Sequence, residues 1–548
     1  MEFDAVLLPG RRAESIAQGH WQDRTINDYL QACVEQHPDK PALTAISLDA
    51  AGETRRFSYR EMAQMADRLA VGLHRLGVRQ GDVVAMQLPN WWQFTLLYLA
   101  CSRIGAVLNP MMHIFREREL TFMVNHAEAK LLVVPKSFRG FDYEAMAMAL
   151  KPELPTVTQI VVVGSTAAHG FEALLSGPAW ENDADAAAIL SQHRPGPDDV
   201  TQLLYTSGTT GEPKGVQHSA NTVTSNIVAY ADRLHLGADD VVLMASPMAH
   251  QTGFMYGLVM PILLQAHAVL QDIWDPKKAI DIINQEGVTF TMASTPFLTD
   301  LTRTVLETGQ QVPTLNTFVC AGAPIPGPLV EQARQGLGTK IISAWGMTEN
   351  GAVTTTLPED DDSLSVTTDG QPLPGVQVKV VDFDDSEMPT GEIGKLLVRS
   401  CSNFGGYLKR PHLNATDDSG WFDTGDLARV DANGYIRISG RSKDVIIRGG
   451  ENIPVFEIES MLYKHPAVSQ VAVVAYADER MGERACAVVV PKEGASLSKE
   501  EMVAFMQQQR VANQYIPERL VLLAAMPATP SGKVQKFKLR DMLRDGQI

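Results

Sequence analysis

The chain has 548 residues, 45% of them hydrophobic and 20% charged. This balance is that of a globular protein with roughly three or four folding units. The 64 acidic and 47 basic residues give a formal net charge of -17, which excludes a general nucleic-acid role because polyanions bind basic surfaces.

The five cysteines argue against a disulfide framework or a zinc site, since they are scattered, odd in number and without CxxC spacing. Residues Met1 to Ser15 contain no long apolar run, so no secretory signal is expected. The most apolar window, Phe254 to Leu270, is broken by Pro261 and falls short of the roughly 20 residues of a bilayer span. We expect a buried core helix there. The scattered cysteines are expected to be reduced thiols, which is typical of a cytoplasmic protein.

Strand-like apolar runs alternate with helix-like stretches along the chain. Residues Val83 to Leu88 precede a helical pattern from Trp92 to Arg103, and Leu131 to Val134 predict a short strand that ends at Pro135. This rhythm, without a repeat of fixed period, predicts a layered α/β fold. The Ala/Asp-rich stretch Asn182 to Ala188 is expected to be a surface connection.

A domain boundary is expected near residue 440, where a glycine-bounded stretch, Gly434 to Gly440, runs into charged residues. About a hundred residues remain, which is enough for a small α/β domain. We therefore divide the chain into an N-terminal domain of 1–442 and a C-terminal domain of 443–548.

Within the second domain, Pro454 is expected to open a helix. The apolar positions of that helix share one face: Val455, Ile458, Met461 and Leu462. The stretches Val468 to Ala475 and Ala485 to Val490 predict strands.

Residues 203–215, with the sequence Leu-Leu-Tyr-Thr-Ser-Gly-Thr-Thr-Gly-Glu-Pro-Lys-Gly, predict a strand that leads into a phosphate-binding loop. Glycines allow close approach of the backbone to an anion, hydroxyls donate hydrogen bonds, and the lysine adds charge. The candidate nucleotide-binding residues are Thr206, Ser207, Gly208, Thr209, Thr210 and Lys214. Pro213 and Gly215 around the lysine exclude a Walker loop. A generic loop of this composition is more often a flexible surface loop.

This loop resembles the signature of the superfamily of acyl-CoA synthetases, peptide-synthetase adenylation domains and firefly luciferase. Five more segments resemble the superfamily's motifs, in its order: 321–326 its adenine loop, 343–349 its aromatic-Gly-x-Thr-Glu motif, 421–426 its ribose motif, 440–444 its hinge and 527–533 its catalytic loop. The resemblance implies a large multi-subdomain N-terminal domain of layered α/β sheets plus a small β-barrel. A small, mobile α/β C-terminal domain would follow.

The resemblance also assigns the nucleotide site. The adenine would lie against Gly322, Ala323 and Pro324, and Trp345, beside Gly346, would stack on it where the family usually has tyrosine. A Trp-Gly pair by itself is more often core packing.

Phosphate and ribose contacts follow from the same motifs. Thr348 would donate to the α-phosphate, and Glu349 and Thr206 would hold Mg²⁺. Asp426 would accept both ribose hydroxyls while Arg441 donates from the other side. An isolated aspartate in Thr-Gly-Asp is more often a turn cap.

Lys533 is the expected catalytic residue, because a carboxylate that attacks the α-phosphate brings two anions together and a lysine between them neutralises the charge. Without the other motifs, Lys533 would be interpreted as a solvated lysine in a Ser-Gly turn. The family then rotates its C-terminal domain about a hinge, here Lys443. Rotation would bring Arg448, Gly449, Gly450 and Glu451 to the coenzyme A (CoA) site.

The acyl pocket is placed by resemblance among apolar segments that contain Phe254, Ala293 and Met347. His250 would border the carboxylate and gate the pocket, although a lone histidine in an apolar stretch is more often a satisfied core residue. Amino-acid-activating relatives have a Phe-Asp-x-Ser pattern near here, whereas this chain has His-Gln-Thr-Gly-Phe. A buried ammonium would lack a partner, so the acid is expected to be uncharged beyond its carboxylate.

The expected function is that of an AMP-forming acid:CoA ligase with ATP, Mg²⁺ and CoA, closest in look to bacterial medium-chain fatty-acyl and cyclohexanecarboxylate CoA ligases. Three alternatives stay open: a stand-alone adenylating enzyme that serves a carrier protein, a luciferase-like oxygenase, and a non-catalytic binding relative. The resemblance leaves a homodimer open, and the sequence does not identify the acid.

Overall fold

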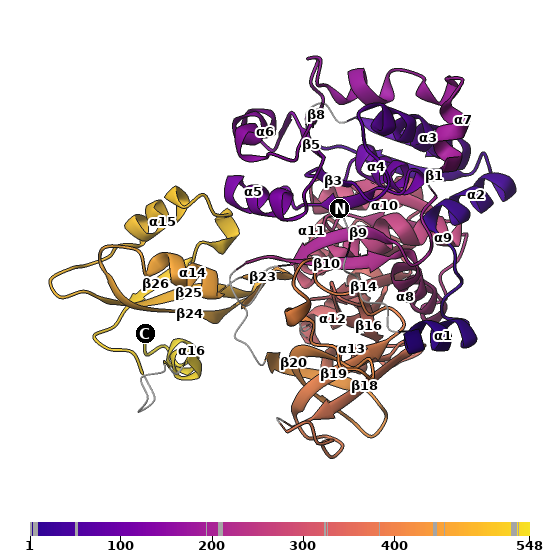
Figure 1. Ribbon diagram of the computed structural model, residues 1–548. Helices are drawn as coiled ribbons and strands as arrows, with labels where there is room; N and C mark the ends of the chain where they lie inside the picture. Colours follow the sequence, from indigo (N-terminus) through magenta and orange to yellow (C-terminus); the bar gives the residue numbers. More distant parts are fainter. Residues whose placement is uncertain are drawn as a thin grey trace.

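The computed structural model describes residues 3, 9–49, 53–192, 194–206, 212–322, 325, 327–382, 384–441, 446–453, 455–527, 534 and 536–548. The part up to residue 441 forms a large lobe, and the part from 446 onward forms a C-terminal lobe beside it (Figure 1). Both lobes combine sheets and helices, which confirms the expected α/β class. No helix in these ranges is long and apolar enough to cross a bilayer.

The larger of two parallel sheets in the large lobe has nine strands. Their order is β17 (Gln371–Pro372), β16 (Gly351–Thr355), β15 (Lys340–Met347), β14 (Thr317–Ala321), β13 (Phe290–Ala293), β11 (Val241–Met244), β12 (His267–Gln271), β1 (Pro41–Ile46) and β2 (Thr54–Ser58). The six strands from β15 to β1 are parallel, and the outer strands are antiparallel to their neighbours.

The second sheet has six strands, in the order β10 (Lys214–Ser219), β9 (Val200–Thr206), β4 (Val107–Pro110), β3 (Val83–Met86), β5 (Leu131–Pro135) and β8 (Gln159–Val163). All but β10 are parallel. Because parallel strands are covered on both faces, β3 and β5 are continuous apolar runs, as their sequences predict. A two-stranded ribbon, β6 (Ser137–Phe138) and β7 (Phe141–Asp142), follows β5.

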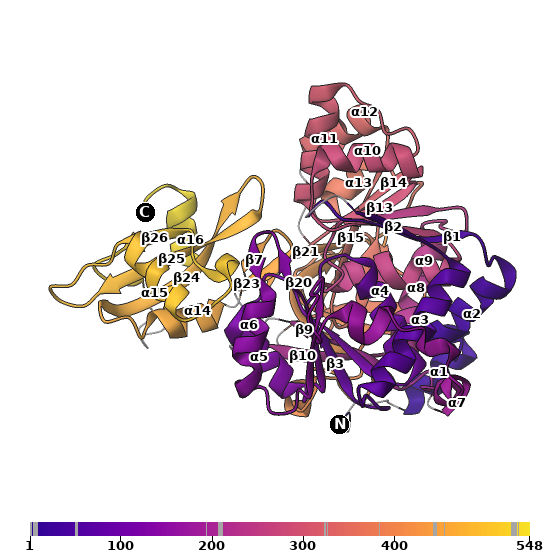
Figure 2. The ribbon, with the colours of Figure 1, turned by 90° about the horizontal axis from the view of Figure 1, so that it is seen from above.

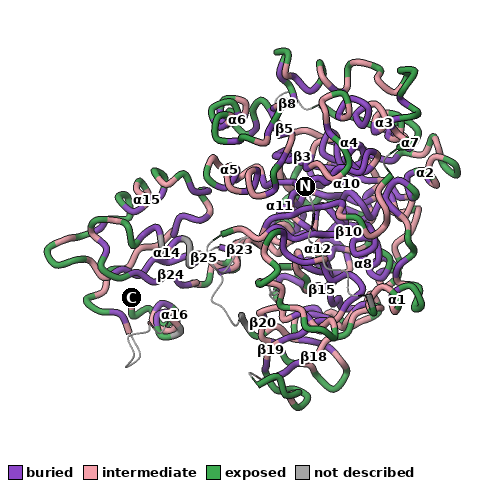
Figure 3. The backbone as a smooth tube through the Cα atoms, viewed as in Figure 1, coloured by how far each residue is buried: buried purple, intermediate pink, exposed green. Residues whose placement is uncertain are grey.

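Helices fill the space between and outside these sheets. In the large lobe they are α1 (Pro9–Ala17), α2 (Ile26–Gln36), α3 (Tyr59–Arg75), α4 (Trp92–Arg103), α5 (Glu117–His126), α6 (Tyr143–Leu150), α7 (Ala186–Gln192), α8 (Ala220–Arg233), α9 (Met260–Leu264), α10 (Pro276–Glu286), α11 (Thr295–Thr308), α12 (Gly327–Leu337) and α13 (Asp362–Thr367). Helix α4, which has the bounds expected from the sequence, contacts β4 and β1, and α8 contacts β10 and β16. These two helices therefore join the two sheets, and their surroundings form the buried interior (Figures 2 and 3).

The opposite face of the nine-stranded sheet has its own core. Strand β14 directs Phe318 and Cys320 toward α10, α11 and α12, whereas Val319 between them joins the main core. This alternation follows from the two-residue period of a strand.

The stretch Phe254 to Leu270 departs from the single helix expected there. It contains the π-helix η4 (Gly253–Val259), the short helix α9, a left-handed residue at Gln265 with φ 59°, and then strand β12. Pro261 lies in the first turn of α9, where its missing N–H coincides with the change from π-helix to α-helix. The buried core helix is therefore confirmed up to Leu264, whereas its expected extension to Leu270 is wrong because β12 begins at His267.

A four-stranded antiparallel sheet completes the large lobe, in the order β18 (Val376–Val381), β19 (Gly394–Ser400), β20 (Phe422–Val430) and β21 (Ile436–Arg441). Within the described residues β18 and β21 do not pair with each other. This open sheet is thus half of the small barrel that the resemblance implies.

The C-terminal lobe is a five-stranded sheet between helices. Its strands are β22 (Ile446–Arg448), β23 (Glu451–Ile453), β24 (Val468–Asp478), β25 (Gly482–Pro491) and β26 (Arg519–Leu522). Alternate residues of β24 and β25 pack on one face against α14 (Val455–Leu462) and α15 (Lys499–Gln508), and on the other against α16 (Lys536–Arg544). The apolar positions of α14 are buried, as expected.

Candidate active site

A cavity of about 350 Å³ lies where parallel strands of both sheets end. Thr206 ends β9, Ala293 ends β13, Gly322 follows β14, and Trp345 and Met347 close β15. The carboxyl ends of parallel strands are the usual ligand sites of open α/β sheets.

The cavity wall unites many residues that the sequence singles out. These are Thr206, Lys214, His250, Ala293, Gly322, Trp345, Gly346, Met347, Thr348, Glu349, Gly449, Gly450 and Glu451. Ser207, Gly208, Thr209, Thr210, Ala323, Pro324, Lys443 and Lys533 lie outside the described residues. The wall therefore combines segments of the large lobe with one hairpin of the C-terminal lobe.

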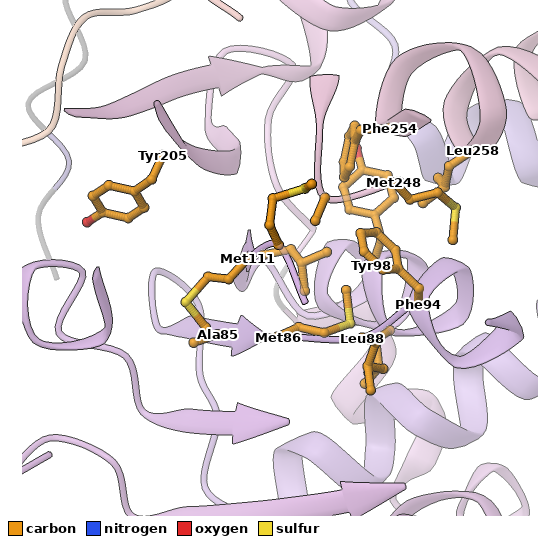
Figure 4. Close-up of a cluster of buried hydrophobic side chains, with 14 of the residues drawn as sticks. Ala85, Met86, Leu88, Phe94, Tyr98, Met111, Tyr205, Met248, Phe254 and Leu258 are labelled. Atoms are coloured by element: carbon orange, nitrogen blue, oxygen red, sulfur yellow. The ribbon is translucent and has the colours of Figure 1, made fainter. Parts of the chain in front are cut away.

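Phe254, expected in the acyl pocket, lies in the core behind the cavity wall. Its ring centroid is 4.8 Å from that of Tyr98 on α4, in an edge-to-face arrangement (Figure 4). The side chain is fully buried and does not line the cavity. Its near neighbours in the sequence, Thr252 and Tyr256, line the cavity instead.

Tyr407, a residue that the sequence reading missed, connects two predicted phosphate-site residues. Its hydroxyl donates to Glu349 Oε1 at 2.7 Å and accepts from Lys214 Nζ at 2.9 Å. Burial and the Glu349 charge raise the pKa of Tyr407 well above its usual value, so it stays a neutral donor. The only local signal was a tyrosine after Gly405 and Gly406, which predicts a turn rather than a ligand.

Thr206 and Glu349 fit a hard cation that arrives with a phosphate. The Thr206 Oγ1 atom is buried and has no hydrogen-bond partner in the described part of the chain, and the Glu349 carboxylate is buried beside the same cavity. No cluster of three His, Cys, Asp or Glu residues in the described ranges could hold a metal by itself. Mg²⁺, which prefers oxygen ligands, usually binds through one or two carboxylates plus substrate phosphates.

His218 holds the backbone of Thr348, and the sequence reading did not identify it. Its Nε2 lies 2.7 Å from the Thr348 carbonyl oxygen and its Nδ1 lies 3.0 Å from Thr222 Oγ1. Burial lowers the pKa of His218 to about 4, so the neutral ring donates through Nε2 at pH 7. This contact fixes the segment that carries Thr348 and Glu349.

The expected ribose aspartate, Asp426, is buried on β20 and accepts a hydrogen bond from Trp345 Nε1 at 3.1 Å. Its backbone pairs with that of Arg441 on β21. The antiparallel register thus brings the two residues of the expected ribose clamp opposite each other.

The remaining wall is mainly apolar and contains one unsatisfied amide. Tyr256, Met292 and Phe297 line it near His250 and Gln251. Gln251 Oε1 accepts from Gln202 Nε2 at 2.8 Å, while its buried Nε2 has no partner in the described ranges. Burial lowers the pKa of His250, which therefore lies neutral at the cavity.

The β22–β23 hairpin brings the C-terminal lobe to the cavity. Gly449 and Gly450 have φ values of 58° and 86°, a left-handed turn that glycine adopts without strain. A Cβ atom on Gly322 would lie 3.4 Å from Gly450 Cα, so the two backbones approach closely. Arg448 faces away from the cavity, since its Nε donates to Glu518 at 2.5 Å within the lobe.

Several polar contacts between the described parts of the two lobes accompany this placement. Arg480 lies 3.4 Å from the buried Asp300 on α11, and the Ala512 amide donates to Glu119 on α5 at 3.3 Å. The described C-terminal lobe is therefore held with its glycine hairpin against the cavity.

Comparison with known proteins places these features in context. Residues 30–408 match the family described as AMP-binding enzyme, and 457–533 match the AMP-binding enzyme C-terminal domain. The chain is 38% identical to a medium-chain fatty-acid–CoA ligase of Escherichia coli (strain K12), over 97% of this chain and 93% of that protein. It is 34% identical to a salicylyl-CoA synthase / salicylate adenylyltransferase of a Streptomyces species, over 96% and 95%.

A solved structure with the same architecture is that of an amide bond synthetase from Marinactinospora thermotolerans. Its TM-score is 0.81 at 26% identity, and the match covers 94% of this chain and 99% of that one. A fatty acyl CoA synthetase from Mycobacterium tuberculosis matches with a TM-score of 0.66, also at 26% identity, over 95% and 99%.

Proposed function

Since this chain belongs to the AMP-binding enzyme family, in which it is an adenylate-forming acyl-CoA ligase, we propose that its substrate is an apolar carboxylic acid. The acid would be a medium-chain fatty acid or an alicyclic acid. ATP and Mg²⁺ would convert it to an acyl-adenylate, and CoA would take the acyl group. The observation that carries this proposal is the single cavity that joins Thr206, Thr348 and Glu349 to an apolar wall and to the glycine hairpin.

In the first half-reaction a carboxylate oxygen attacks the α-phosphorus of ATP and diphosphate leaves. Lys214 would neutralise charge that develops on the phosphoryl oxygens, and the Thr348 hydroxyl would donate a hydrogen bond to them. Glu349 and Thr206 would hold Mg²⁺, which supplies further positive charge. Tyr407 keeps the Glu349 carboxylate oriented through its hydrogen bond. Lys533 is proposed to complete this set.

In the second half-reaction the CoA thiol replaces AMP on the acyl carbon. The turn at Gly449 and Gly450 lines the cavity, and the absence of side chains there would let the pantetheine arm approach the backbone. We propose that the described lobe placement serves this step, and that the lobe rotates about Lys443 for adenylation. The two steps need different groups at one site, which favours such a movement.

The acid is inferred from the wall and from the most similar curated relatives. Tyr256, Met292 and Phe297 are apolar or neutral neighbours for an alkyl chain or a ring. Medium-chain acyl groups appear in the name of the E. coli relative, which supports this size. The five cysteines are unpaired and buried, which supports a reducing, cytoplasmic location.

A substrate panel tests the proposal. Purified protein with ATP, Mg²⁺ and CoA is given octanoate, cyclohexanecarboxylate or salicylate, and AMP and acyl-CoA are measured. We expect octanoate or cyclohexanecarboxylate to give the highest kcat/KM. Turnover of salicylate alone would contradict the proposed acid, and acyl transfer to a carrier protein but not to CoA would contradict the proposed acceptor.

A further inference from the structure

The carboxylate of Glu451 lies in the cavity wall. Its only role so far is its expected place in the CoA site. Glu451 begins β23 directly after the two glycines of the hairpin, and its half-buried side chain lines the cavity. Within the described ranges, no hydrogen bond or ion pair engages its carboxylate. A carboxylate removed from water normally acquires such a partner, so its absence points to a partner supplied by a substrate.

Arg448, the residue opposite Glu451 in the hairpin, forms its ion pair with Glu518. Arg448 pairs with Glu451 across the hairpin through the backbone, but its Nε donates to Glu518. Glu518 also lies 3.6 Å from Arg484. Glu483 on β25 accepts a hydrogen bond from the backbone amide of Ile447, the neighbour of Arg448 on β22. In the described part of the C-terminal lobe, Arg448 thus acts on Glu451 by its charge but forms its ion pair with Glu518.

Charged and titratable groups of the large lobe face the same cavity. These are Lys214, His250, Tyr256, Glu349, Tyr407 and Asp423. Lys214 is held by the Tyr407 hydroxyl, and burial keeps His250 neutral. In this setting burial raises the pKa of Glu451 to about 7, and the Arg448 charge opposes that rise only in part.

We propose that Glu451 is the general base of the second half-reaction. Its carboxylate takes the proton from the CoA thiol while the sulfur forms a bond to the acyl carbonyl carbon. The bond between that carbon and the phosphate oxygen breaks, AMP leaves with the electron pair, and Glu451 returns the proton to water. This inference rests on the proposed function, because it requires CoA as the acceptor.

The position of Glu451 suits this role for two physical reasons. A base is most effective when its pKa lies near the working pH, and a thiol of pKa about 8.5 is largely protonated at pH 7. Because the residue lies on the C-terminal hairpin beside Gly450, the base is present when that hairpin faces the acyl group. The thiol is then ionised only where the acyl-adenylate can react.

The experiment separates the two half-reactions in the full-length protein. Thioester formation from pre-made octanoyl-adenylate and CoA is followed in single turnovers between pH 5.5 and 9. Adenylate formation from octanoate and ATP is measured separately, with hydroxylamine as a trap whose neutral amine needs no base before attack. The variants are Glu451→Gln and Glu451→Asp, with Glu493→Gln in an exposed loop as the matched control.

For the wild type we expect the thioester rate to rise through pH 7 and then level off. Glu451→Gln should lower that rate roughly 10²- to 10⁴-fold at pH 7. Its residual rate should climb about tenfold per pH unit toward the thiol pKa. Glu451→Asp should recover part of the loss, and hydroxamate formation should stay within about twofold in every variant.

Two results would overturn the assignment. One is a wild-type thioester rate and pH profile in Glu451→Gln, and the other is an equal loss of hydroxamate and thioester, which indicates a structural role. A wild-type protein that forms hydroxamate but no acyl-CoA would instead contradict the proposed function from which this inference starts.

Discussion

The indole nitrogen of Trp345 donates a hydrogen bond to Asp426 Oδ2 at 3.1 Å. Trp345 lies at the end of β15 in the nine-stranded sheet, and Asp426 lies on β20 of the antiparallel sheet. The bond therefore ties the residue proposed to stack on adenine to the residue proposed to bind the ribose. A phenyl ring at position 345 would lack this N–H donor.

We predict that Trp345→Phe weakens ATP binding although an aromatic ring remains at the proposed adenine-stacking position. A hydrogen bond to a charged acceptor contributes about 1.5–3 kcal/mol, so the Kd for ATP should rise roughly tenfold or more. The measurement is calorimetric titration with a non-hydrolysable ATP analogue. The maximal adenylation rate at saturating ATP should change much less than the affinity.

Trp91→Phe is the matched control, because Trp91 Nε1 donates to Asp272 Oδ2 at 2.9 Å in a similar pair. Neither residue lines the cavity. This variant should keep wild-type ATP affinity. An unchanged Kd in Trp345→Phe, or equal changes in both variants, would show that the Trp345–Asp426 bond does not organise the nucleotide site.

The sequence predicted the regular parts of the fold well. Helix α4 was expected with its observed bounds, and β5 differs by one residue, because periodic apolar patterns follow directly from helix and strand geometry. Residues Phe254 to Leu270 were misread because a run that is apolar on every side has no period. Gln265, in the left-handed conformation, ends the helical run, and Pro261 lies near the change from π-helix to α-helix within it.

The candidate site was predicted where motifs are contiguous and missed where contacts are tertiary. Thr348 and Glu349 belong to one motif, but Tyr407 and His218 reach them from distant segments through hydrogen bonds. A single sequence gives no signal for such contacts. The same limit explains Phe254, whose place behind the wall depends on packing against Tyr98.

Arg480→Glu should slow thioester formation without slowing adenylation. Arg480 lies 3.4 Å from Asp300, and reversing its charge places two carboxylates across the lobe interface. The Arg480 side chain is 66% exposed, so the pair contributes at most about 1 kcal/mol. We expect a loss of about fivefold at low salt that shrinks at high salt, measured from pre-made acyl-adenylate and CoA.

Arg480→Lys keeps the charge and should retain most of the thioester rate. Arg303, which lies 2.9 Å from Asp300 on the same helix, provides a second control because its ion pair does not cross between lobes. If Arg303→Glu and Arg480→Glu slowed both half-reactions alike, the interface contact would have no specific role in the thioester step.

Histidines whose pKa is lowered in the folded chain should make stability depend on pH. The pKa of His218 is about 4 in the folded chain and about 6.5 when exposed. Between these two pH values the unfolded state therefore binds more protons than the folded state. The contribution of His218 to the free energy of unfolding is thus fully present above pH 6.5 and is lost as the pH falls toward 4. His113 and His267, with pKa values also lowered to about 4, act in the same direction.

His218→Asn tests this contribution. The variant should be less stable than wild type at pH 7.5, because the Thr348 carbonyl loses its donor. Its melting temperature should fall less between pH 7 and pH 4.5, since one titrating group, worth up to roughly 3 kcal/mol, is gone. His412→Asn, at an exposed position, should leave the pH dependence unchanged. Parallel curves for His218→Asn and wild type would contradict the assignment.

Lys533→Ala should divide the two half-reactions in the sense opposite to Glu451→Gln. If Lys533 neutralises charge between the carboxylate and the α-phosphate, its loss removes a stabilising group from the first transition state only. By analogy with the loss of one oxyanion donor, adenylation should slow by roughly 10²- to 10³-fold. Thioester formation from pre-made acyl-adenylate should stay near wild type, because the described lobe placement presents Gly449, Gly450 and Glu451 to the cavity for that step. Pyrophosphate release and single-turnover acyl-CoA formation measure the two rates. Equal damage to both would refute the division of labour between the lysine and the hairpin.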